Sequence, residues 1–477
     1  MEHLFEKLDR NAESDLYPCH MPGHKRNGWG KLPQQLYRMD ITEIDGFDDL
    51  HQPEGILLEL QKKAAALCGA DESFYLVNGS TGGILSAVSA ALPAGGHILM
   101  ARNCHRSAYH AAYLRNLRIS YLYPEIWGDY DIFEAVTPRQ VKEALEKAPD
   151  AGAVLVVSPT YEGRIADIAG IAEAVHERGI PLIVDEAHGA HLGFSSKVHE
   201  NSCRQGADLV IQSVHKTLPA LTQTALLHVN GERIDRELLK RFLRIYQSSS
   251  PSYLLMASID NALQYLEQDG DRAFAEFRRR YDRMRERLER CRVLKFLPAD
   301  ERRQDIGKLL ISVKNTEMTG RQLYDILLSR YRIQPEMAAE SYVLAMFTIN
   351  DSQEGYDRMT EALLEIDSRL KQVGDLEDMA LNRASFEIWP EISCSLTEAW
   401  NESREEILLK KSVGRLAGEF VNLYPPGVPV LVPGEKITEE LCRRIDTWLR
   451  QGLTVQGVSI LEGRQLIKVI KNGNSGI

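Results

Sequence analysis

Long apolar runs are absent from this 477-residue sequence, where none approaches the ~20 residues that span a bilayer. We therefore expect no contact with a membrane. The N-terminus has no basic segment followed by an apolar one, so we expect no signal peptide and a cytoplasmic protein. Cysteine is sparse, with seven residues scattered along the chain and no Cys-x-x-Cys pair. This spacing gives no indication of a disulfide framework or a zinc ribbon.

Basic residues are outnumbered, because 57 Lys and Arg against 68 Asp and Glu give a formal net charge of −11. Nucleic acid requires a basic surface, so we expect no such partner. The sequence also lacks the Gly-x-x-x-x-Gly-Lys-Ser/Thr and Gly-x-Gly-x-x-Gly loops that bind nucleotide phosphates. Without such a loop, the helicase-like tetrapeptide Asp185-Glu-Ala-His188 is interpreted as a coincidence.

Short apolar segments alternate with helical patterns from residue 56 onwards. We expect strands at 74–77, 98–101, 153–157, 181–185, 208–211 and 225–229, and helices at 56–68, 84–92, 167–178 and 233–246. This alternation predicts an α/β fold with a largely parallel sheet and helices on both faces. Ligands of such folds bind beyond the carboxyl ends of the strands. The polar segments 78–83, 103–107, 185–191 and 212–216 all fall at those ends.

Composition and turn signals divide the chain into four parts. These are an N-terminal arm (1–55), a large domain (56–291), a small α+β domain (292–373) and a C-terminal α+β module (378–477). The arm has too few apolar residues to fold alone, so we expect it to pack over a site or a partner subunit. A long charged helix over 258–291 links the two domains. A linker near Gly374 precedes the module, which is expected to have helices near 397–422.

Two charged residues follow buried strands. Asp185 ends the strand 181–185, and Lys216 lies just past the strand 208–211. A lysine at the edge of a core is desolvated, which lowers its pKa and frees an amine that can bond to an aldehyde. A carboxylate can keep a pyridine nitrogen protonated. A lone lysine would be a solvated surface residue, but this pair predicts a pyridoxal phosphate site.

The segment Asn78–Gly83 lies between a strand and a helix and is rich in glycine and hydroxyl groups. Helix N-terminal amides, with the hydroxyls of Ser80 and Thr81, could bind a phosphate there. An ordinary helix cap is the alternative. His188 and His191 could bind a metal together with Asp185, but no second carboxylate-rich cluster supports this, so no metal is expected.

Eight motifs run in a fixed order along almost the whole chain. They are Met21-Pro-Gly-His-Lys25, Asp48-Asp-Leu-His51-x-Pro-x-Gly55, Asn78-Gly-Ser-Thr-x-Gly83, Asn103-x-His105-Arg-Ser107, Ser158-Pro-Thr-Tyr161, Asp185-Glu-Ala-His188, Ser213-x-His215-Lys216 and Tyr424-Pro-Pro-Gly-x-Pro…Pro-Gly-Glu435. In these motifs the sequence resembles the Orn/Lys/Arg decarboxylases, pyridoxal phosphate enzymes of the aspartate-aminotransferase fold (fold type I). The resemblance implies α-decarboxylation of arginine, lysine or ornithine, as in polyamine biosynthesis.

The resemblance also implies roles for individual residues. Lys216 would hold the cofactor aldehyde, Asp185 would pair with the pyridine nitrogen, and His105 would stack on the ring. The other expected cofactor contacts are Ser80, Thr81, His188, Ser213 and His215, together with Ser248 and Ser249, which would reach the phosphate of a neighbouring subunit. A homodimer is therefore the expected minimal unit. His215 and Lys216 are the candidates for returning a proton to Cα.

Two departures from the family pattern concern assembly and substrate. Only residues 1–19 precede His20 and the first motif, so the chain resembles a short form without the N-terminal wing of large members. His188 stands where some large members have tryptophan, so their substrate preference is not carried over. Similar short-form proteins are often arginine decarboxylases, which favours arginine as substrate and agmatine as product.

A buried substrate cation needs a carboxylate partner. Glu435 is the expected partner, and a cap of the helix that starts near Thr438 is its alternative role. An aminotransferase would begin with the same cofactor bond, so the residues alone leave that reaction open. A cofactor-holding regulator is less favoured, because Lys216 and Asp185 are both present.

Overall fold

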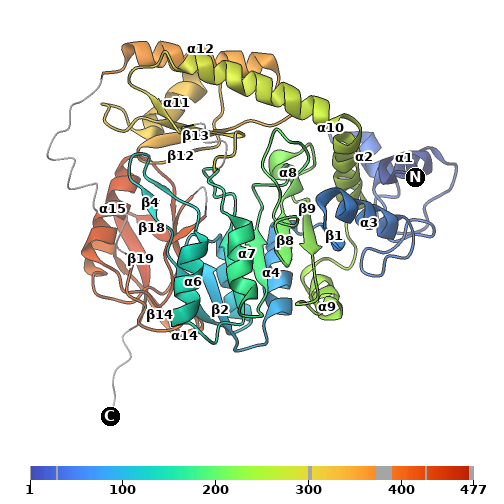
Figure 1. Ribbon diagram of the computed structural model, residues 1–477, viewed down its shortest axis with the longest axis horizontal. Coiled ribbons are helices and arrows are strands. Elements are labelled where there is room, and N and C mark those ends of the chain that lie inside the picture. The colour runs from blue at the N-terminus through green and yellow to red at the C-terminus, as the bar shows by residue number, and fades with distance from the viewer. Residues whose placement is uncertain (1, 28–30, 299–302, 372–388, 425–426, 472–477) are drawn as a thin grey trace.

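A seven-stranded sheet forms the centre of the protein, with the strand order β1-β9-β8-β7-β6-β2-β3 (Figure 1). The computed structural model describes residues 2–27, 31–298, 303–371, 389–424 and 427–471. The strands are β1 (Glu72–Leu76), β2 (His97–Ala101), β3 (Arg118–Leu122), β6 (Ala153–Val157), β7 (Leu182–Asp185), β8 (Leu209–Gln212) and β9 (Ala225–Val229). Only β9 runs antiparallel to its neighbours, and the other four pairings are parallel. The expected largely parallel sheet is confirmed.

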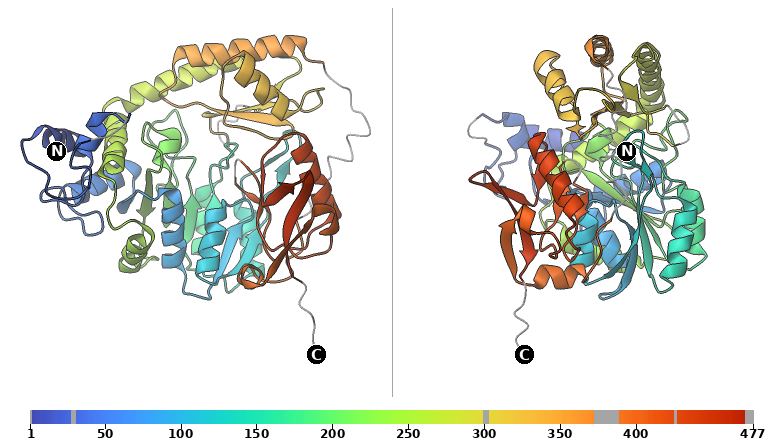
Figure 2. Two further views of the ribbon diagram at one scale, coloured as in Figure 1. Left: turned by 180° about the vertical axis from the view of Figure 1, so that it is seen from behind. Right: turned by 90° about the vertical axis from the view of Figure 1, so that its left-hand side faces the viewer.

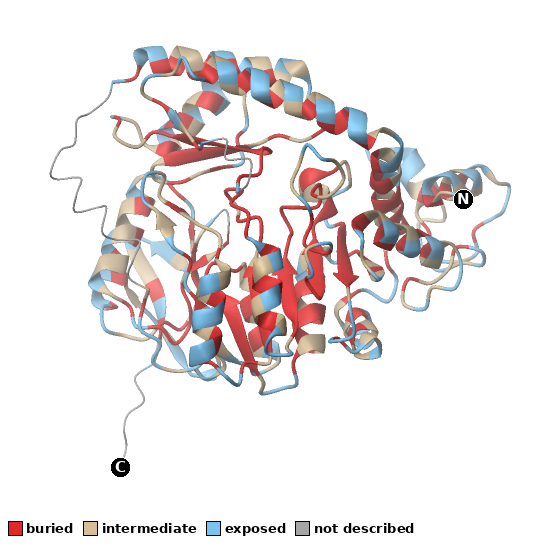
Figure 3. Cartoon of the chain, viewed as in Figure 1, coloured by how far each residue is buried: buried red, intermediate tan, exposed pale blue. Residues whose placement is uncertain are grey.

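Helices cover both faces of this sheet, so its inner strands β2, β6, β7, β8 and β9 are buried along nearly their whole length instead of alternating. The helices are α3 (Ile56–Cys68), α4 (Gly79–Ala91), α5 (Arg106–Leu114), α6 (Pro138–Lys147), α7 (Ile168–His176) and α9 (Arg236–Tyr246). On one face α4 contacts α5 and α9, while α6 and α7 pack together on the other. Figure 3 shows the buried inner strands in red, whereas the edge strands β1 and β3 are partly exposed.

The helix expected at 84–92 begins earlier, at Gly79, so the glycine-rich segment forms its first turn instead of a separate loop. Gly83 allows this helix to lie close to the sheet. A Cβ atom at Gly83 would lie 2.7 Å from Leu76 Cδ1 and 2.9 Å from Ile211 Cγ2. The glycine therefore brings the N-terminus of α4 against the ends of β1 and β8.

The N-terminal arm is more regular than its turn-forming residues predict. It contains α1 (Leu4–Glu13) and α2 (Gln34–Met39). Helix α1 packs on α10 (Tyr253–Leu288) of the same chain, with Leu4 and Leu8 fully buried. His3 Nδ1 lies 3.0 Å from an Asp260 carboxylate oxygen of α10. The arm thus shares an apolar core with the long helix.

The 36-residue helix α10 runs from beside the arm to the small domain (Figure 1). The small domain has a four-stranded sheet in the order β10-β11-β13-β12. Its elements are β10 (Lys295–Phe296), β11 (Lys308–Ser312), α11 (Gly320–Arg330), β12 (Met337–Ala338), β13 (Tyr342–Met346) and α12 (Gln353–Arg369). One apolar cluster joins the arm, α10 and this domain, because it includes Leu8, Phe274 and Leu309.

The C-terminal module has two three-stranded sheets, β14-β19-β18 and β16-β15-β17. Its elements are α14 (Leu396–Asn401), β14 (Arg404–Leu408), the 3-10 turn η3 (Leu409–Lys411), β15 (Val421–Leu423), β16 (Pro429–Leu431), α15 (Glu439–Arg450), β17 (Val455–Gln456), β18 (Val458–Leu461) and β19 (Arg464–Ile470). Figure 2 shows the module on the same side of the central sheet as α4 and α5. There, Tyr113 of α5 donates a hydrogen bond to Asn401, 2.8 Å away.

The helices expected near 397–422 are mostly wrong. Only 396–401 is α-helical, 409–411 forms a single 3-10 turn, and Arg404–Leu408 forms a strand that pairs with β19. Its Arg, Glu and Leu residues favour helices, but pairing with a neighbouring strand overrides that preference. The linker expected near Gly374 lies outside the described residues. None of the described helices combines the length and the apolar character needed to cross a bilayer.

Candidate active site

Lys216 lies in α8 (Val214–Thr217), a single helical turn directly after β8. Its Nζ atom is 3.1 Å from His188 Nε2. Burial lowers the pKa of the Lys216 amine, although Asp185 and Glu336 act in the opposite direction. A lysine with a lowered pKa exposes a lone pair that can attack a carbonyl carbon.

Asp185 is the last residue of β7, where it lies opposite Ile211 of β8 in the sheet. It is buried, and Ala187 N donates a hydrogen bond of 3.2 Å to its carboxylate. Burial raises the pKa of Asp185, whereas the nearby charge of Lys216 lowers it. The structure therefore brings together the two charged residues that the sequence placed at the ends of neighbouring strands.

The N-terminus of α4 provides the amide groups expected of a phosphate site. Ser80 and Thr81 lie in its first turn, and both are accessible. Asn78 does not cap this helix, because its side chain donates instead to Tyr246 O, 3.0 Å away. Ser213 Oγ is fully buried and has no protein partner among the described residues. A hydroxyl in that position is free to bind an acceptor such as a phosphate oxygen.

The remaining predicted cofactor contacts lie at different depths. His215 Nδ1 donates to the carbonyl of Thr224, 2.8 Å away, which leaves Nε2 as its acceptor. Ser248 and Ser249 are exposed. Ser248 follows closely on Tyr246, whose carbonyl binds Asn78. The serines therefore lie on the surface near the start of α4.

His105 caps the N-terminus of α5, with Ser107 N donating to its Nδ1 at 3.2 Å. Burial, assisted by the charge of Lys216, lowers the pKa of His105 to about 4, so the ring is neutral near neutral pH. A Cβ atom at Gly427 of the C-terminal module would lie 3.5 Å from the ring. The module thus reaches over His105. Stacking of His105 on a cofactor ring stays a prediction.

Near Lys216, the functional groups of Tyr161, Lys308 and Glu336 were not assigned a role from the sequence. His188, itself predicted, is buried between Lys216 and Lys308, with Lys308 Nζ 3.0 Å from Nδ1. The Tyr161 ring meets the His188 ring edge-on at 4.8 Å, and the Tyr161 hydroxyl donates to Glu336. Tyr161 lies in a quoted motif, but Lys308 and Glu336 lie in none.

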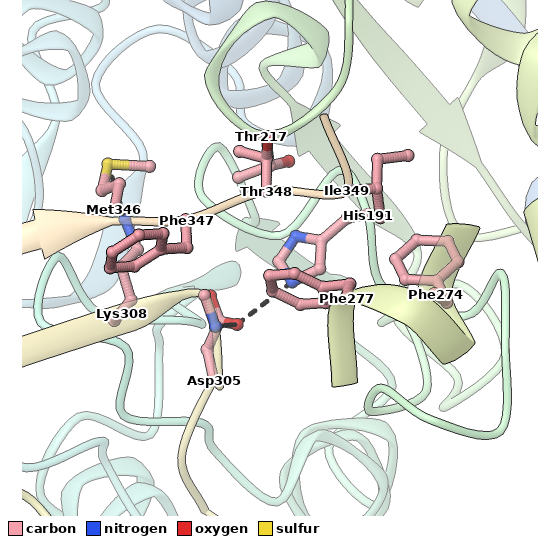
Figure 4. A pocket seen from close by; sticks show the side chains of 11 residues that line it. His191, Thr217, Phe274, Phe277, Asp305, Lys308, Met346, Phe347, Thr348 and Ile349 are labelled. Atoms are coloured by element: carbon pink, nitrogen blue, oxygen red, sulfur yellow. Dashed lines mark hydrogen bonds and ion pairs between the residues drawn. The ribbon is translucent and has the colours of Figure 1, made fainter. Parts of the chain in front are cut away.

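A second histidine, His191, is paired with Asp305 and lines the same small cavity as Lys308. Its Nε2 atom lies 3.1 Å from Asp305 Oδ1, and Figure 4 shows this pair beside Thr217 and Lys308. The cavity between them is about 10 Å³, the size of one water molecule. His191 Nδ1, Thr217 Oγ1 and Asp305 Oδ2 have no protein partner among the described residues. The lining is mostly apolar, with Phe274, Phe277 and Phe347, but these unpartnered polar atoms could bind one water molecule there.

The expected roles of Glu435 need correction. Its carboxylate oxygens accept bonds of 3.0 and 2.9 Å from Arg102 Nη2, and Val432 N donates to it at 2.7 Å. Both side chains are buried, so the carboxylate is fully used inside the chain. The helix-cap alternative is also wrong, because the Thr438 side chain caps α15. Glu435 joins the module to the large domain instead of facing a substrate.

A cavity of about 830 Å³ opens between the large domain, the small domain and the module. This volume suits a small-molecule site. Asn103, Thr160 and Tyr161 bring the ends of β2 and β6 to its wall. Its acidic lining residues are Asp131, Glu162, Glu317, Glu340, Glu440 and Asp446. Four basic residues, Lys314, Arg443, Arg444 and Arg450, also line it, so the lining has only a small excess of acidic groups.

The sheet order, the strand-end aspartate and the half-buried lysine after the next strand define a fold type I pyridoxal phosphate enzyme. The lysine decarboxylase of Francisella novicida has the same fold, with a TM-score of 0.85 at 18% identity over 98% of this chain and 81% of that chain. Family models for the major and C-terminal domains of Orn/Lys/Arg decarboxylases match residues 3–305 and 379–451.

Two relatives are similar over nearly their whole length. The chain is 33% identical over 470 residues to an arginine decarboxylase of Bacillus subtilis (strain 168), covering 95% of each. It is 31% identical over 482 residues to one of Bacillus anthracis, covering 98% of this chain and 97% of the relative. The chain belongs to the Orn/Lys/Arg decarboxylase family and is a decarboxylase of basic amino acids.

The family and fold imply a pyridoxal phosphate cofactor, and the residues present fit it. Lys216 would supply an amine for the aldehyde, Asp185 a carboxylate for the pyridine nitrogen, and the α4 N-terminus with Ser213 the donors for a phosphate. When bound, the cofactor supplies an electron sink for the charge left at Cα as carbon dioxide departs. The individual site residues stay predictions.

Proposed function

We propose that this protein decarboxylates L-arginine to agmatine and carbon dioxide. The observation that carries this choice is the full-length similarity to arginine decarboxylases at 31–33% identity. The lysine decarboxylase with a similar structure is 18% identical. A role of agmatine in polyamine synthesis is the further expectation.

Loss of the carboxylate requires that its bond to Cα stands perpendicular to the cofactor ring. The chain must then return one proton to Cα. Lys216 and His215 are the candidates, and their settings favour Lys216. His215 Nδ1 is held by the Thr224 carbonyl, whereas Lys216 Nζ lies against His188, from which it can regain a proton.

Glu336 replaces Glu435 as our candidate for binding the guanidinium of arginine. Its carboxylate accepts a hydrogen bond from Tyr161, whose ring contacts His188. Its charge acts on both Lys216 and Lys308, so it lies near the reactive amine. Glu336 is exposed, so its carboxylate remains accessible to a ligand. An arginine side chain would find there an anionic partner that planar guanidinium groups bind well.

The test measures agmatine, cadaverine and putrescine formation side by side from arginine, lysine and ornithine. We expect agmatine to dominate. The variant Glu336→Gln should lower kcat/KM for arginine by at least ~tenfold, or about 1.4 kcal/mol. Glu354→Gln, at the exposed start of α12, is the matched control. Dominant cadaverine or putrescine would contradict the arginine proposal, and keto acid without carbon dioxide would contradict decarboxylation.

We also infer a homodimer with shared cofactor sites, in which Ser248 or Ser249 reaches the phosphate in the partner. Their exposure near the α4 N-terminus is compatible with this arrangement. Mixing the inactive variants Lys216→Ala and Ser248→Tyr tests it, because a mixed dimer would contain one intact site. Activity that returns on mixing supports sharing. A mixture that stays inactive while forming mixed dimers would show that each site is built within one chain.

A further inference from the structure

His188 lies between two lysine side chains. Its Nε2 atom is 3.1 Å from Lys216 Nζ, and its Nδ1 atom is 3.0 Å from Lys308 Nζ. Lys308 is the first residue of β11 in the small domain, so the contact crosses from one domain to the other. Lys308 is only 2% exposed, which excludes bulk water as its main partner. Figure 4 shows Lys308 beside Asp305 and Met346.

The protonation states of these three groups depend on one another. A neutral imidazole accepts one hydrogen bond and donates one, whereas an ammonium group only donates. Two ammonium groups therefore cannot both be satisfied by the His188 ring. If Lys308 carries the ammonium, Nδ1 accepts, the ring proton sits on Nε2, and Lys216 must be a neutral amine.

The surroundings favour the ammonium on Lys308. Its Nζ lies 3.2 Å from Met346 Sδ and 5.6 Å from the centre of the Tyr161 ring. A thioether sulfur and an aromatic face both attract a buried cation. The carboxylate of Asp305 also stabilises the charge on Lys308. Lys216, by contrast, must be uncharged to attack an aldehyde.

We propose that Lys308 is a positioning residue that fixes the Nε2–H tautomer of His188 and holds a proton in reserve for Lys216. This proposal deepens the proposed function and rests on Lys216 being the reactive lysine. In the transfer, a Lys308 N–H bond breaks as a proton passes to His188 Nδ1. The Nε2–H bond breaks as its proton passes to Lys216 Nζ. One positive charge thereby moves from Lys308 to Lys216, and His188 stays neutral with its proton on the other nitrogen.

Other titratable groups also act on this chain of three. Burial lowers the pKa of Lys308 to about 8, and burial with the two lysine charges lowers the pKa of His188 well below its usual range. The further groups that face the three residues are Asp185, Asp305, Glu162, Glu336, His105 and His215. A low pKa of His188 keeps the ring neutral, as the transfer requires.

The direct test observes the His188 tautomer in the cofactor-free protein by nitrogen NMR of labelled histidine, with His188→Gln to assign the signal. Wild type and Lys308→Gln should show the proton on Nε2, because the Gln amide also donates to Nδ1. Lys308→Met cannot donate and should lose this preference. Lys63→Met, which removes a lysine paired with Glu267, is the control and should leave the tautomer unchanged. An unchanged tautomer in Lys308→Met would overturn the proposal.

A second measurement follows how fast cofactor-free Lys216 captures pyridoxal phosphate as the pH varies. In Lys308→Met the capture rate near neutral pH should fall by ~tenfold, equivalent to one unit in the pKa of Lys216. This loss should disappear in the His188→Gln background if Lys308 acts through His188. A loss that persists undiminished would show that Lys308 acts by charge alone, which also overturns the proposal.

Neither measurement depends on arginine. A protein that fails to decarboxylate arginine but passes both tests would contradict the proposed function and leave this inference intact. Should Lys308→Met not fold, Lys308→Gln still decides the case. It keeps the donor but cannot supply a proton, so we expect a wild-type tautomer with slower reprotonation of Lys216. Proton exchange at Lys216 Nζ that keeps its wild-type rate in Lys308→Gln, measured by nitrogen NMR, would overturn the proton reserve.

Discussion

The guanidinium of Arg102 and the carboxylate of Glu435 form a bidentate ion pair between the large domain and the C-terminal module. Arg102 Nη2 lies 3.0 and 2.9 Å from the two carboxylate oxygens, and Arg102 Nη1 donates to Pro429 O at 2.6 Å. The Trp389 ring centre is 5.1 Å from the guanidinium carbon. Removing one member of such a buried pair leaves an uncompensated charge.

Arg102→Met should therefore destabilise the protein by about 3 kcal/mol, since Glu435 would stay buried without its partner. A denaturant titration followed by tryptophan fluorescence measures this, because Trp389, Trp400 and Trp448 all belong to the module. Arg139→Met, at an exposed pair with Glu143, is the control and should cost less than about 0.5 kcal/mol. Equal effects of the two variants would contradict an interdomain role of the buried pair.

Lys216→Ala should abolish both decarboxylation and the visible absorption band of the lysine-bound cofactor. Without the amine, the cofactor has only non-covalent contacts with the site. Absorption spectra of wild type and variant, each incubated with pyridoxal phosphate, give the measurement. A wild type that stays colourless with the cofactor supplied would refute the assignment of Lys216.

Gly83→Ala should weaken cofactor binding by at least ~tenfold. The new methyl group would press on Leu76 and Ile211, both fully buried, and push the start of α4 away from the sheet. Such overpacking typically costs about 1–3 kcal/mol. Cofactor titration of the apoprotein measures the change. Gly128→Ala, where a Cβ meets nothing within 4 Å, should bind normally. Tight binding by Gly83→Ala would show that the seating of α4 is not critical.

Acid should destabilise the protein partly through His228. Burial lowers its pKa to about 3, and its ring bonds Ser73 at 2.6 Å and Gln212 at 3.1 Å as a neutral group. The unfolded chain binds a proton at this residue below about pH 6.5, whereas the folded chain does not until about pH 3. Stability is therefore full above about pH 6.5 and falls by up to about 1.4 kcal/mol per unit below it.

The measurement compares the midpoints of urea unfolding at neutral pH and at about pH 5 for wild type and His228→Gln, since glutamine does not titrate. The variant should be less stable near neutral pH but lose less on acidification. A variant with the same pH slope as the wild type would show that other groups cause the acid loss.

The sequence predicts those parts of the fold whose pattern is local. The helix predicted over 56–68 matches α3, because its apolar periodicity ends at Gly69. The strand predicted over 153–157 matches β6, because it is a short apolar run. The proximity of Asp185 and Lys216 could be predicted from the sequence, because the carboxyl ends of neighbouring parallel strands meet at one edge of a sheet.

The parts that were missed depend on contacts distant in the sequence. Arg404–Leu408 has helix-forming residues but forms a strand because β19 lies beside it. No sequence pattern near Glu435 predicts that its carboxylate forms an ion pair with Arg102. Lys308 opens an ordinary apolar strand, and only the packing of the small domain brings it to His188. No local motif could have signalled these pairings.

The length of α10 limits which insertions and deletions this chain can tolerate in evolution. Its 36 residues span about 54 Å, and one inserted residue would turn everything beyond it by about 100°. Because the arm packs on the N-terminal part of the helix, this rotation would displace the small domain. Surface loops can gain or lose residues freely, but this helix must keep its residue count. The number of residues in α10 therefore decides whether Lys308 of the small domain reaches His188 of the large domain.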